Sequence, residues 1–560
     1  MSILSRLVVI SGLVFGFALH SSNAQSVQEL FQGARGALAD EEFEKAESDL
    51  RHALGLSLNS LGLAYARTGN GEMAEIALKE AVSASIINDR ALLNLVKFYL
   101  KSDQVELGTE AVEKLLEINP IHPEGRHLLG LLHLVGGNPN AASHVLRDAY
   151  LVASKNRDVG VSLVSCYVAL ENEEEALQII NELTAEGSGM GALKLRLGRV
   201  FLERGAFEKA VEYLRGALSD DLVNRVEAAH YLSQALLGAG QSEEAAALKA
   251  EANQFQKADA SVLWEGLIED PAGKPEEIPS LRKSSAFAYG KLGEVGMQTG
   301  SYRRAAGQIE RALFWDSEMP GLNLLLGLAR FRGELVVEAV EPVREALRRH
   351  PGNPQALQLL VQITIRLADI GQMTEARETV DYLLTQAPET SYLFVLRGRI
   401  RGESDDVEGA LEDFSRALEL NPNVPEVHYN IGVLHLQSNR LDEAVAEFER
   451  ELEVNPSHEM AMIRKAAVLV DGNRGGEALP LLQSALELDP ELGPAYALRG
   501  RIQLRMGQAN EAIVSLERAS RLEPENAAVF LDLSTAYGEA GRQNDAEAAL
   551  ERHRALMGNQ

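Results

Sequence analysis

The sequence is poor in cysteine, in aromatic residues and in basic residues, and each shortage argues against a class of protein. Its single cysteine among 560 residues, Cys166, excludes an intrachain disulfide and a thiolate metal cage. Aromatic residues make up only 5%, so a core must be built from alanine, leucine, valine and isoleucine. Lys and Arg number 54 against 82 Asp and Glu, and the net charge of −28 disfavours binding to nucleic acid or to anionic membranes. The 46% of hydrophobic residues is too high for a disordered chain, so we expect an acidic, folded protein.

The N-terminal residues have the pattern of a secretory signal peptide. Arg6 precedes an apolar run over residues 7–19, and the small residues Ser22 and Ala24 follow it. As a helix this run rises about 20 Å, less than the roughly 30 Å of a bilayer core. We therefore expect residues 1–24 to be removed by cleavage after Ala24, which gives a periplasmic or secreted chain without an integral membrane span. An uncleaved N-terminal membrane anchor is the alternative.

One alanine that follows a turn recurs through the rest of the sequence. It occurs fourteen times, and Gly108 fills the one missing position. Most steps are 34 residues, the first is 28, and a single step of 60 indicates a 26-residue interruption at 260–285. A regular period of this length indicates stacked structural repeats. The recurring residues are Ala46, Ala74, Ala142, Ala176, Ala210, Ala245, Ala305, Ala339, Ala376, Ala410, Ala444, Ala478, Ala512 and Ala546.

Each unit has the pattern of two amphipathic helices. In residues 425–458, Ile431 and Leu434 belong to the apolar stripe of a first helix, and Ala444 and Phe448 to that of a second. A proline then ends the second helix, because proline cannot continue it. The pattern therefore predicts an all-α protein built from helical hairpins.

These spacings resemble the tetratricopeptide repeat. The family places Gly or Ala at position 8 of each unit, Ala at 20 and 27, and Pro at 32. Over residues 27–259 and 286–560, the resemblance implies a right-handed α-solenoid of about fifteen helix-turn-helix repeats with an inner groove lined by the first helices. Glycine stands at position 8 in Gly62, Gly130, Gly198, Gly293, Gly327, Gly398, Gly432 and Gly500. Proline stands at position 32 in Pro120, Pro351, Pro388, Pro422, Pro456, Pro490 and Pro524.

The interruption divides the predicted repeats into two arrays. We expect seven repeats over 27–259, a proline-containing linker over 260–285 and eight repeats over 286–560. The linker is interpreted as a hinge, and the alternative is a rigid elbow in which Trp264 caps the first array. Glycine at position 8 should allow the paired helices of each unit to approach closely, with the small residue of the second helix facing the first helix.

Residues that could carry chemistry have structural explanations. His428 and His435 are seven residues apart, as a metal pair on a helix could be, but they occupy positions where the family packs large side chains. Cys166 has the surroundings of a small buried residue. The acidic run 173–175 complements the dipole of a helix N-terminus. No phosphate loop or nucleophile motif is present, so we expect no catalytic residue, no metal and no cofactor, and we interpret the protein as not being an enzyme.

The inner groove is where the resemblance locates partner binding. Positions 2, 5, 9, 12 and 13 of the later units give a surface that is apolar in the middle, with arginines at both ends. We expect it to hold an extended or helical peptide whose acidic groups meet the arginines. The alternative is that the arginines pair with nearby acidic residues of the same chain. The candidate residues are Tyr392, Arg399, Tyr429, Val433, Ile463, Arg501 and Arg505.

The sequence favours an exported, non-catalytic scaffold for protein or peptide partners, with a role in envelope or secretion complex assembly as the family analogy. The alternative is an accessory subunit that recruits substrates for a separate enzyme such as a glycosyltransferase. Polymer binding is disfavoured, because sugar sites use aromatic rings and the chain has two tryptophans. The family members that bind carboxylate tails of cytosolic chaperones use a residue set of which only Asn430 and Arg464 match.

Overall fold

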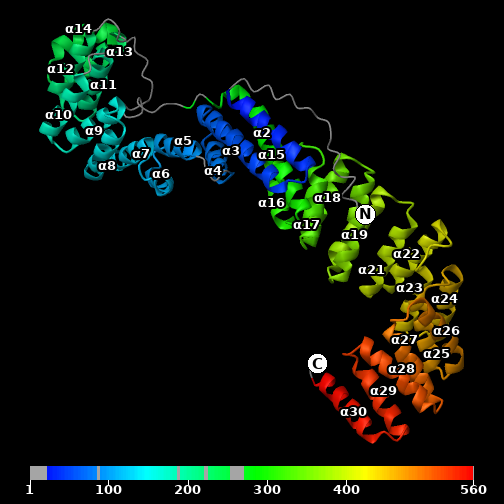
Figure 1. Ribbon diagram of the computed structural model, residues 1–560. Helices are drawn as coiled ribbons and strands as arrows, with labels where there is room; N and C mark the ends of the chain where they lie inside the picture. Colours follow the sequence, from blue (N-terminus) through cyan, green and yellow to red (C-terminus); the bar gives the residue numbers. More distant parts are fainter. Residues whose placement is uncertain are drawn as a thin grey trace. The chain divides into compact units, whose positions relative to one another are not determined.

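The computed structural model describes residues 22–84, 89–185, 190–219, 225–252, 270 and 272–558. The chain divides into two compact units, residues 1–322 and 323–560. Within the described ranges every regular element is a helix and none is a strand, as Figure 1 shows, so the all-α prediction is confirmed. Most of the predicted signal peptide lies outside these ranges, as do Trp264 and Pro271 of the predicted linker.

The first unit is a succession of antiparallel helix pairs. Within each hairpin the two helices contact one another and are joined by a short turn. Its helices are α2 (Ser22–Ala39), α3 (Phe43–Arg67), α4 (Gly71–Ala84), α5 (Asp89–Lys101), α6 (Val105–Ile118), α7 (Pro123–Val135), α8 (Pro139–Val152), α9 (Arg157–Ala169), α10 (Glu173–Thr184), α11 (Met190–Glu203), α12 (Phe207–Leu218), α13 (Arg225–Gly238), α14 (Ser242–Ala252), the short 3-10 helix η2 (Pro275–Glu277), α15 (Ile278–Gln298) and α16 (Tyr302–Trp315).

The second unit continues the same arrangement. Its helix α17 begins at Leu322, the last residue of the first unit. The step of 37 residues in this region corresponds to α19, which begins at Pro354 and so takes in the extra residues 354–356. The helices are α17 (Leu322–Arg332), α18 (Val336–Arg349), α19 (Pro354–Asp369), α20 (Met373–Gln386), α21 (Ser391–Glu403), α22 (Val407–Leu420), α23 (Val427–Gln437), α24 (Leu441–Val454), α25 (Glu459–Asp471), α26 (Gly475–Leu488), α27 (Gly493–Arg505), α28 (Ala509–Leu522), α29 (Ala527–Glu539) and α30 (Gln543–Met557).

All fourteen recurring alanines are buried. The most exposed of them, Ala546 in the last hairpin, has 7% of its surface accessible. Each lies near the start of a second helix. The alanines therefore recur because one buried small residue is packed in each hairpin, as the sequence pattern predicted.

Glycine is required at position 8 because a large side chain of the paired second helix packs against it. A Cβ placed on any of the eight would lie 2.3–2.7 Å from the side chain sixteen residues later, closer than real contacts allow. The sequence interpretation assigned this close approach to the small residue of the second helix, whereas the nearest atoms belong to its large apolar residue. The pairs are Gly62 with Leu78, Gly130 with Leu146, Gly198 with Leu214, Gly293 with Ile309, Gly327 with Val343, Gly398 with Phe414, Gly432 with Phe448, and Gly500 with Leu516.

A left-handed residue marks the turn of every hairpin. Five positions before each recurring alanine, and before Gly108, the backbone φ is positive, which gives fifteen such turns. Glycine adopts this conformation without a steric penalty, but seven of the turns use Glu, Asp or Asn. The fifteen turn residues are Glu41, Gly69, Asp103, Gly137, Glu171, Gly205, Gly240, Gly300, Glu334, Gly371, Asp405, Asn439, Asn473, Gly507 and Gly541.

The long helix α3 explains the short first step of 28 residues. It is 25 residues long and combines the second helix of the first repeat with the first helix of the second repeat, so the connecting turn is missing. Helix α15 packs along α3, and near the middle of this contact the Oγ atoms of Ser57 and Ser284 lie 3.0 Å apart. The two helices are antiparallel, since Gly273 contacts Ser60 while Arg304, just beyond α15, pairs with Glu47.

Helix α15 begins inside the predicted linker of 260–285. Of the three prolines assigned to that linker, Pro275 begins the short helix η2 and Pro279 lies in the first turn of α15. The division of the repeats into arrays of seven and eight, and the choice between hinge and elbow, stay predictions.

Candidate functional site

The predicted groove residues lie on four first helices of the second unit, α21, α23, α25 and α27. Tyr392 exposes 46% of its surface, and Tyr429 and Val433 are half-buried. Ile463 is buried, with 4% accessible, so its side chain belongs to the packing of α25. The exposed part of the predicted surface is therefore supplied by the other residues.

The arginines of this surface make contacts within the chain. Arg501 reaches from α27 to Asp532 on α29, with 3.0 Å between its Nη2 and the carboxylate oxygen. Arg505 donates a hydrogen bond to the carbonyl oxygen of Val470. Arg399 lies 3.9 Å from Glu403 on the same helix. Arg501 thus has the intramolecular partner that the alternative interpretation expected, and a role for these arginines in partner binding stays a prediction.

A buried carboxylate organises the middle of the same region. Glu451 on α24 has no accessible side-chain surface and accepts hydrogen bonds from the backbone N–H groups of Glu426 and Tyr429, at 2.9 and 3.3 Å. The ring of Tyr429 stacks on His458 with 4.7 Å between centroids. Since the first turn of a helix leaves N–H groups without helical partners, Glu451 supplies the acceptors that the start of α23 lacks.

Of the two histidines considered as a metal pair, His428 has a carboxylate partner within the chain. His428 Nδ1 lies 2.7 Å from Glu447 Oε2, and this contact joins α23 to α24. Glu447 also pairs with Arg450. In the described ranges no group of three or more His, Cys, Asp or Glu residues is placed to hold a metal ion.

A polar cluster that the sequence reasoning missed lies in the first unit. Asp270 is 8% exposed and receives hydrogen bonds from Arg90, whose Nε lies 2.5 Å from Oδ2 and whose Nη2 pairs with Oδ1. Asn94 donates to Oδ2 at 3.1 Å and to the side chain of Asn59 at 3.0 Å. Burial alone would raise the pKa of Asp270, but the hydrogen bonds from Arg90, the Ala272 backbone and Asn94 hold that pKa below its usual value.

The backbone next to Asp270 is bound in the same place. Arg67 at the end of α3 donates hydrogen bonds of 2.5 Å to the carbonyl oxygens of Asp270, Ala272 and Gly273. Asn59, Arg67, Arg90 and Asn94 together form what we call the Asp270 site. No motif marks these residues in the sequence, because the site joins helices near residues 60 and 90 to a segment about 180 positions downstream.

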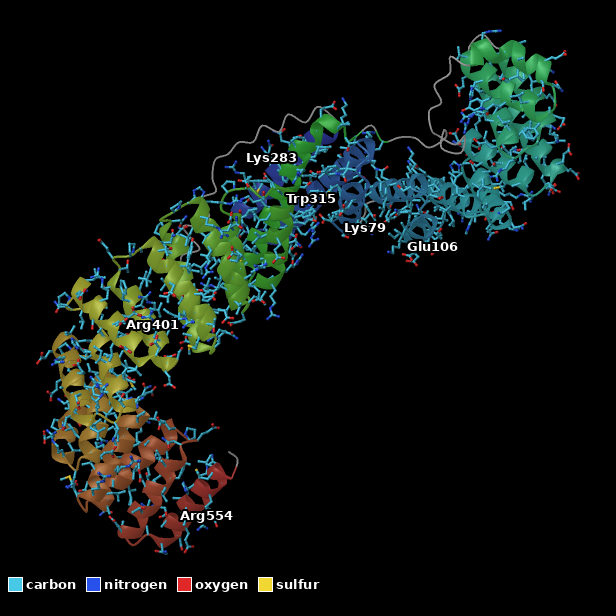
Figure 2. The ribbon with its side chains drawn as sticks, turned by 180° about the vertical axis from the view of Figure 1, so that it is seen from behind. Lys79, Glu106, Lys283, Trp315, Arg401 and Arg554 are labelled. Carbon is cyan, nitrogen blue, oxygen red and sulfur yellow. The ribbon has the colours of Figure 1, made fainter. Side chains whose placement is uncertain are left out.

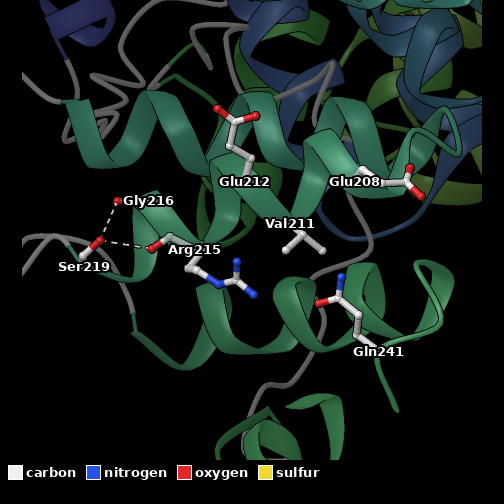
Figure 3. Close-up of a pocket in the computed structure, with 7 residues that line it drawn as sticks. All are labelled: Glu208, Val211, Glu212, Arg215, Gly216, Ser219 and Gln241. Atoms are coloured by element: carbon white, nitrogen blue, oxygen red, sulfur yellow. Dashed lines mark hydrogen bonds between the residues drawn. The ribbon is translucent and has the colours of Figure 1, made fainter. Parts of the chain in front are cut away.

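A surface hollow of about 480 Å³ lies on α12, beside the turn that leads to α14. Arg215 at its edge pairs with Glu244, 2.9 Å away. Figure 3 shows the Ser219 hydroxyl, which donates to the carbonyl oxygens of Arg215 and Gly216. The remaining lining residues include Glu208, Glu212 and Gln241. The hollow has mixed polarity, and its arginine is already paired.

Cys166 and His127 are buried in the first unit. Burial raises the pKa of the Cys166 thiol to about 12, so the thiol stays protonated at neutral pH. This agrees with the prediction of a small packed residue. His127 Nε2 lies 3.0 Å from the Ser162 hydroxyl. Among the helices that the structure describes, none combines the length and the apolar composition needed to cross a bilayer.

Helical hairpins that mostly repeat every 34 residues, each with a buried alanine or glycine and a left-handed turn, define the protein as an α-solenoid. Sequence comparison matches the tetratricopeptide repeat family at residues 291–354, 395–457, 429–493 and 503–559. These residues therefore form tetratricopeptide repeats. Repeats of this kind bind protein or peptide partners, which supports a protein-interaction scaffold.

Among curated relatives, human "Protein IFIT1 homolog B" is 24% identical over 174 residues, which are 30% of this chain and 35% of the relative. "Interferon-induced protein with tetratricopeptide repeats 2" from Cricetulus griseus is 28% identical over 140 residues, 23% of this chain and 29% of the relative. The match thus spans about a third of the length of these relatives.

Two solved structures match parts of this chain. YrrB, a tetratricopeptide repeat protein described with an unusual peptide-binding site, is 21% identical with a TM-score of 0.29, covering 33% of this chain and 95% of its own. The Cut9–Hcn1 hetero-tetramer of the APC/C is 15% identical with a TM-score of 0.35, covering 84% and 95%.

Proposed function

We propose that the protein is an exported, non-catalytic scaffold that binds protein or peptide partners on the first helices of its second unit. The observation that carries the proposal is the exposure of large apolar side chains at groove positions. Tyr392 exposes 46%, Met460 38% and Leu531 44% of their surfaces. These residues give three first helices, α21, α25 and α29, an exposed apolar side chain at a groove position, which favours a binding surface there. The second helices α24, α26 and α28 also expose Leu441, Leu488 and Val514, so the groove positions, and not exposure alone, define the proposed surface.

Charge on the same helices suggests the kind of partner. Arg399 and Arg505 lie on first helices, and Arg399 has its nearest acidic partner at the long distance of 3.9 Å. A partner carboxylate could replace such a contact at small cost, because exposed ion pairs contribute little. We therefore propose an extended or helical peptide with both apolar and acidic residues as the ligand.

Export rests on the pattern of residues 1–24, and it would place the partner in the bacterial envelope or outside the cell. The mass of the mature N-terminus tests this part. A protein that begins at Gln25 supports export with cleavage, whereas an intact N-terminus in the membrane fraction supports the anchored alternative.

Partner recovery from an envelope extract tests the binding surface. We expect the full-length Arg399→Glu/Arg501→Glu variant to recover less partner than the wild type. The matched control is Arg416→Glu/Arg521→Glu, which makes the same charge change at exposed positions of the second helices α22 and α28. Equal recovery by all three proteins, with unchanged helical content by circular dichroism, would remove the proposed surface.

A further inference from the structure

The Asp270 site has the composition of a receptor for an extended acidic peptide. Its side chains come from two helices, α3 and α5, and they bind a segment that is not part of either repeat. Arg90 contacts both oxygens of the Asp270 carboxylate, and Asn94 adds a third donor. An arginine that bonds both oxygens of a carboxylate recognises its planar geometry as well as its charge.

The site also recognises the main chain of its occupant. Arg67 donates to three carbonyl oxygens, those of Asp270, Ala272 and Gly273, and so it binds the segment whatever the side chains are. Side-chain specificity comes instead from the carboxylate. This division, with main-chain contacts for affinity and one side-chain contact for selectivity, is how extended peptides are generally bound.

Glycine is required at one position of the occupant. Gly273 has φ +75°, and a Cβ there would lie 2.0 Å from the carbonyl oxygen of Ser60 and 2.9 Å from the backbone N of Ala64. No side-chain movement relieves these contacts, because the atoms belong to the backbone of α3. The site therefore fits a segment with an aspartate followed three residues later by a glycine.

We propose that this site is a peptide receptor that the chain fills with its own residues Asp270, Ala272 and Gly273. The tethered occupant competes with any partner peptide that carries the same aspartate and glycine. A short tether supplies an effective concentration on the order of millimolar, so a free peptide of ordinary affinity is excluded until the tethered segment leaves. Release would expose the receptor and free the N-terminal end of α15 from this side of α3.

Competition in the full-length protein tests the proposal. The probe is a fluorescein-labelled peptide with the sequence of residues 268–277, and its binding is measured by anisotropy. We expect Gly273→Ala to bind the probe at least about tenfold more tightly than the wild type, because the tethered competitor is displaced. Gly300→Ala is the matched control: its φ is also +75° but no atom lies within 4 Å of the added Cβ, so it should bind like the wild type.

Two further arms test the recognition chemistry. The Arg90→Ala/Gly273→Ala double variant should lose the gained affinity, and a probe with Asn in place of its Asp should not bind Gly273→Ala. Equal binding by Gly273→Ala and the wild type, or equal binding of the Asn probe, overturns the proposal. If Gly273→Ala loses helical content by circular dichroism, Asp270→Asn takes its place, since it keeps the volume of the side chain and removes the charge. None of these residues belongs to the partner surface of the second unit, so failure here leaves that proposal standing.

Discussion

The indole Nε1 of Trp315 donates a hydrogen bond of 2.8 Å to the Glu80 carboxylate, although the two residues lie 235 positions apart in the chain. The hydroxyl of Tyr289 donates to the same carboxylate at 2.9 Å, and Arg311 forms an ion pair with it. Trp315, labelled in Figure 2, is fully buried. One acidic residue of α4 thus satisfies polar groups from both α15 and α16.

Replacing Glu80 should loosen this contact. Glu80→Ala leaves the buried N–H of Trp315 without its acceptor, and we expect a loss of about 1–3 kcal/mol in the stability of the α4–α16 contact. The chain has two tryptophans, so a Trp264→Phe background lets fluorescence report on Trp315 alone. The emission should shift to longer wavelength at lower urea concentration than in the background protein. Glu72→Ala, an exposed change on the same helix, should leave the transition in place.

Glycine-to-alanine substitution should have opposite effects at a position-8 glycine, Gly500, and at a helix glycine without close neighbours, Gly538. Gly500→Ala places a Cβ 2.5 Å from Leu516, and overpacking of this kind costs about 1–3 kcal/mol. Gly538→Ala in α29 meets nothing within 4 Å and should gain up to about 1 kcal/mol from helix propensity. Hydrogen exchange of the α27 and α29 amides measures both changes locally. Stabilisation by Gly500→Ala would contradict the packing account.

The sequence was sufficient for the parts of the fold that depend on local spacing. Ala444 and Gly432 recur at fixed positions, so their burial follows from the period, although the side chain that meets Gly432 is that of Phe448 and not that of Ala444. The contact of α3 with α15 could not be predicted, because it depends on pairs such as Ser57 with Ser284 that belong to no period. The Asp270 site was missed for the same reason, since nothing near Asp270 in the sequence indicates Arg90.

The alanine period located the turns of the hairpins, but it did not reveal their left-handed residue, because the type of that residue varies. Glycine occupies the left-handed position in some turns, whereas Glu171, Asp405 or Asn439 occupies it in others, so no single residue type repeats. The backbone requirement is constant even though the residue is not. A search for glycine alone would therefore have found only part of the series.

Substitutions at these turns should show the cost of the left-handed backbone. Gly507 has φ +73° and open space around it, so Gly507→Ala isolates backbone strain and should destabilise its hairpin by about 1 kcal/mol. Glu171→Gly removes the same strain, which offsets the greater flexibility of glycine in the unfolded chain, and should change stability by less than about 1 kcal/mol. Urea denaturation of the two variants measures both. A neutral Gly507→Ala together with a strongly destabilised Glu171→Gly would contradict this account.

Buried His127 should make the first unit sensitive to acid. The Ser162 hydroxyl donates its proton to the Asp158 carbonyl oxygen, 3.1 Å away, so it can only accept from His127, and we assign the imidazole proton to Nε2. Burial lowers the pKa of His127 to about 4, from an ordinary value of 6.5. Nearby Asp158 and Glu124 oppose this shift, while Arg196 and Lys97 add to it. The folded state thus keeps a neutral imidazole over a pH range in which the unfolded chain is protonated.

The direction in which folding stability changes with pH follows from the number of protons that each state binds. Between pH 6.5 and about 4 the unfolded state binds more protons at this residue, so stability is fully present above 6.5 and falls as the pH drops to about 4. The shift corresponds to roughly 3 kcal/mol. His127→Gln removes the titrating group. The difference in the free energy of unfolding between the wild type and this variant, measured by urea denaturation, should therefore shrink by that amount between pH 6.5 and about 4. His144→Gln, an exposed change on α8, controls for loss of a histidine and should keep the wild-type slope. Parallel pH profiles for the wild type and His127→Gln would show that His127 is protonated as readily in the folded protein as in the unfolded chain.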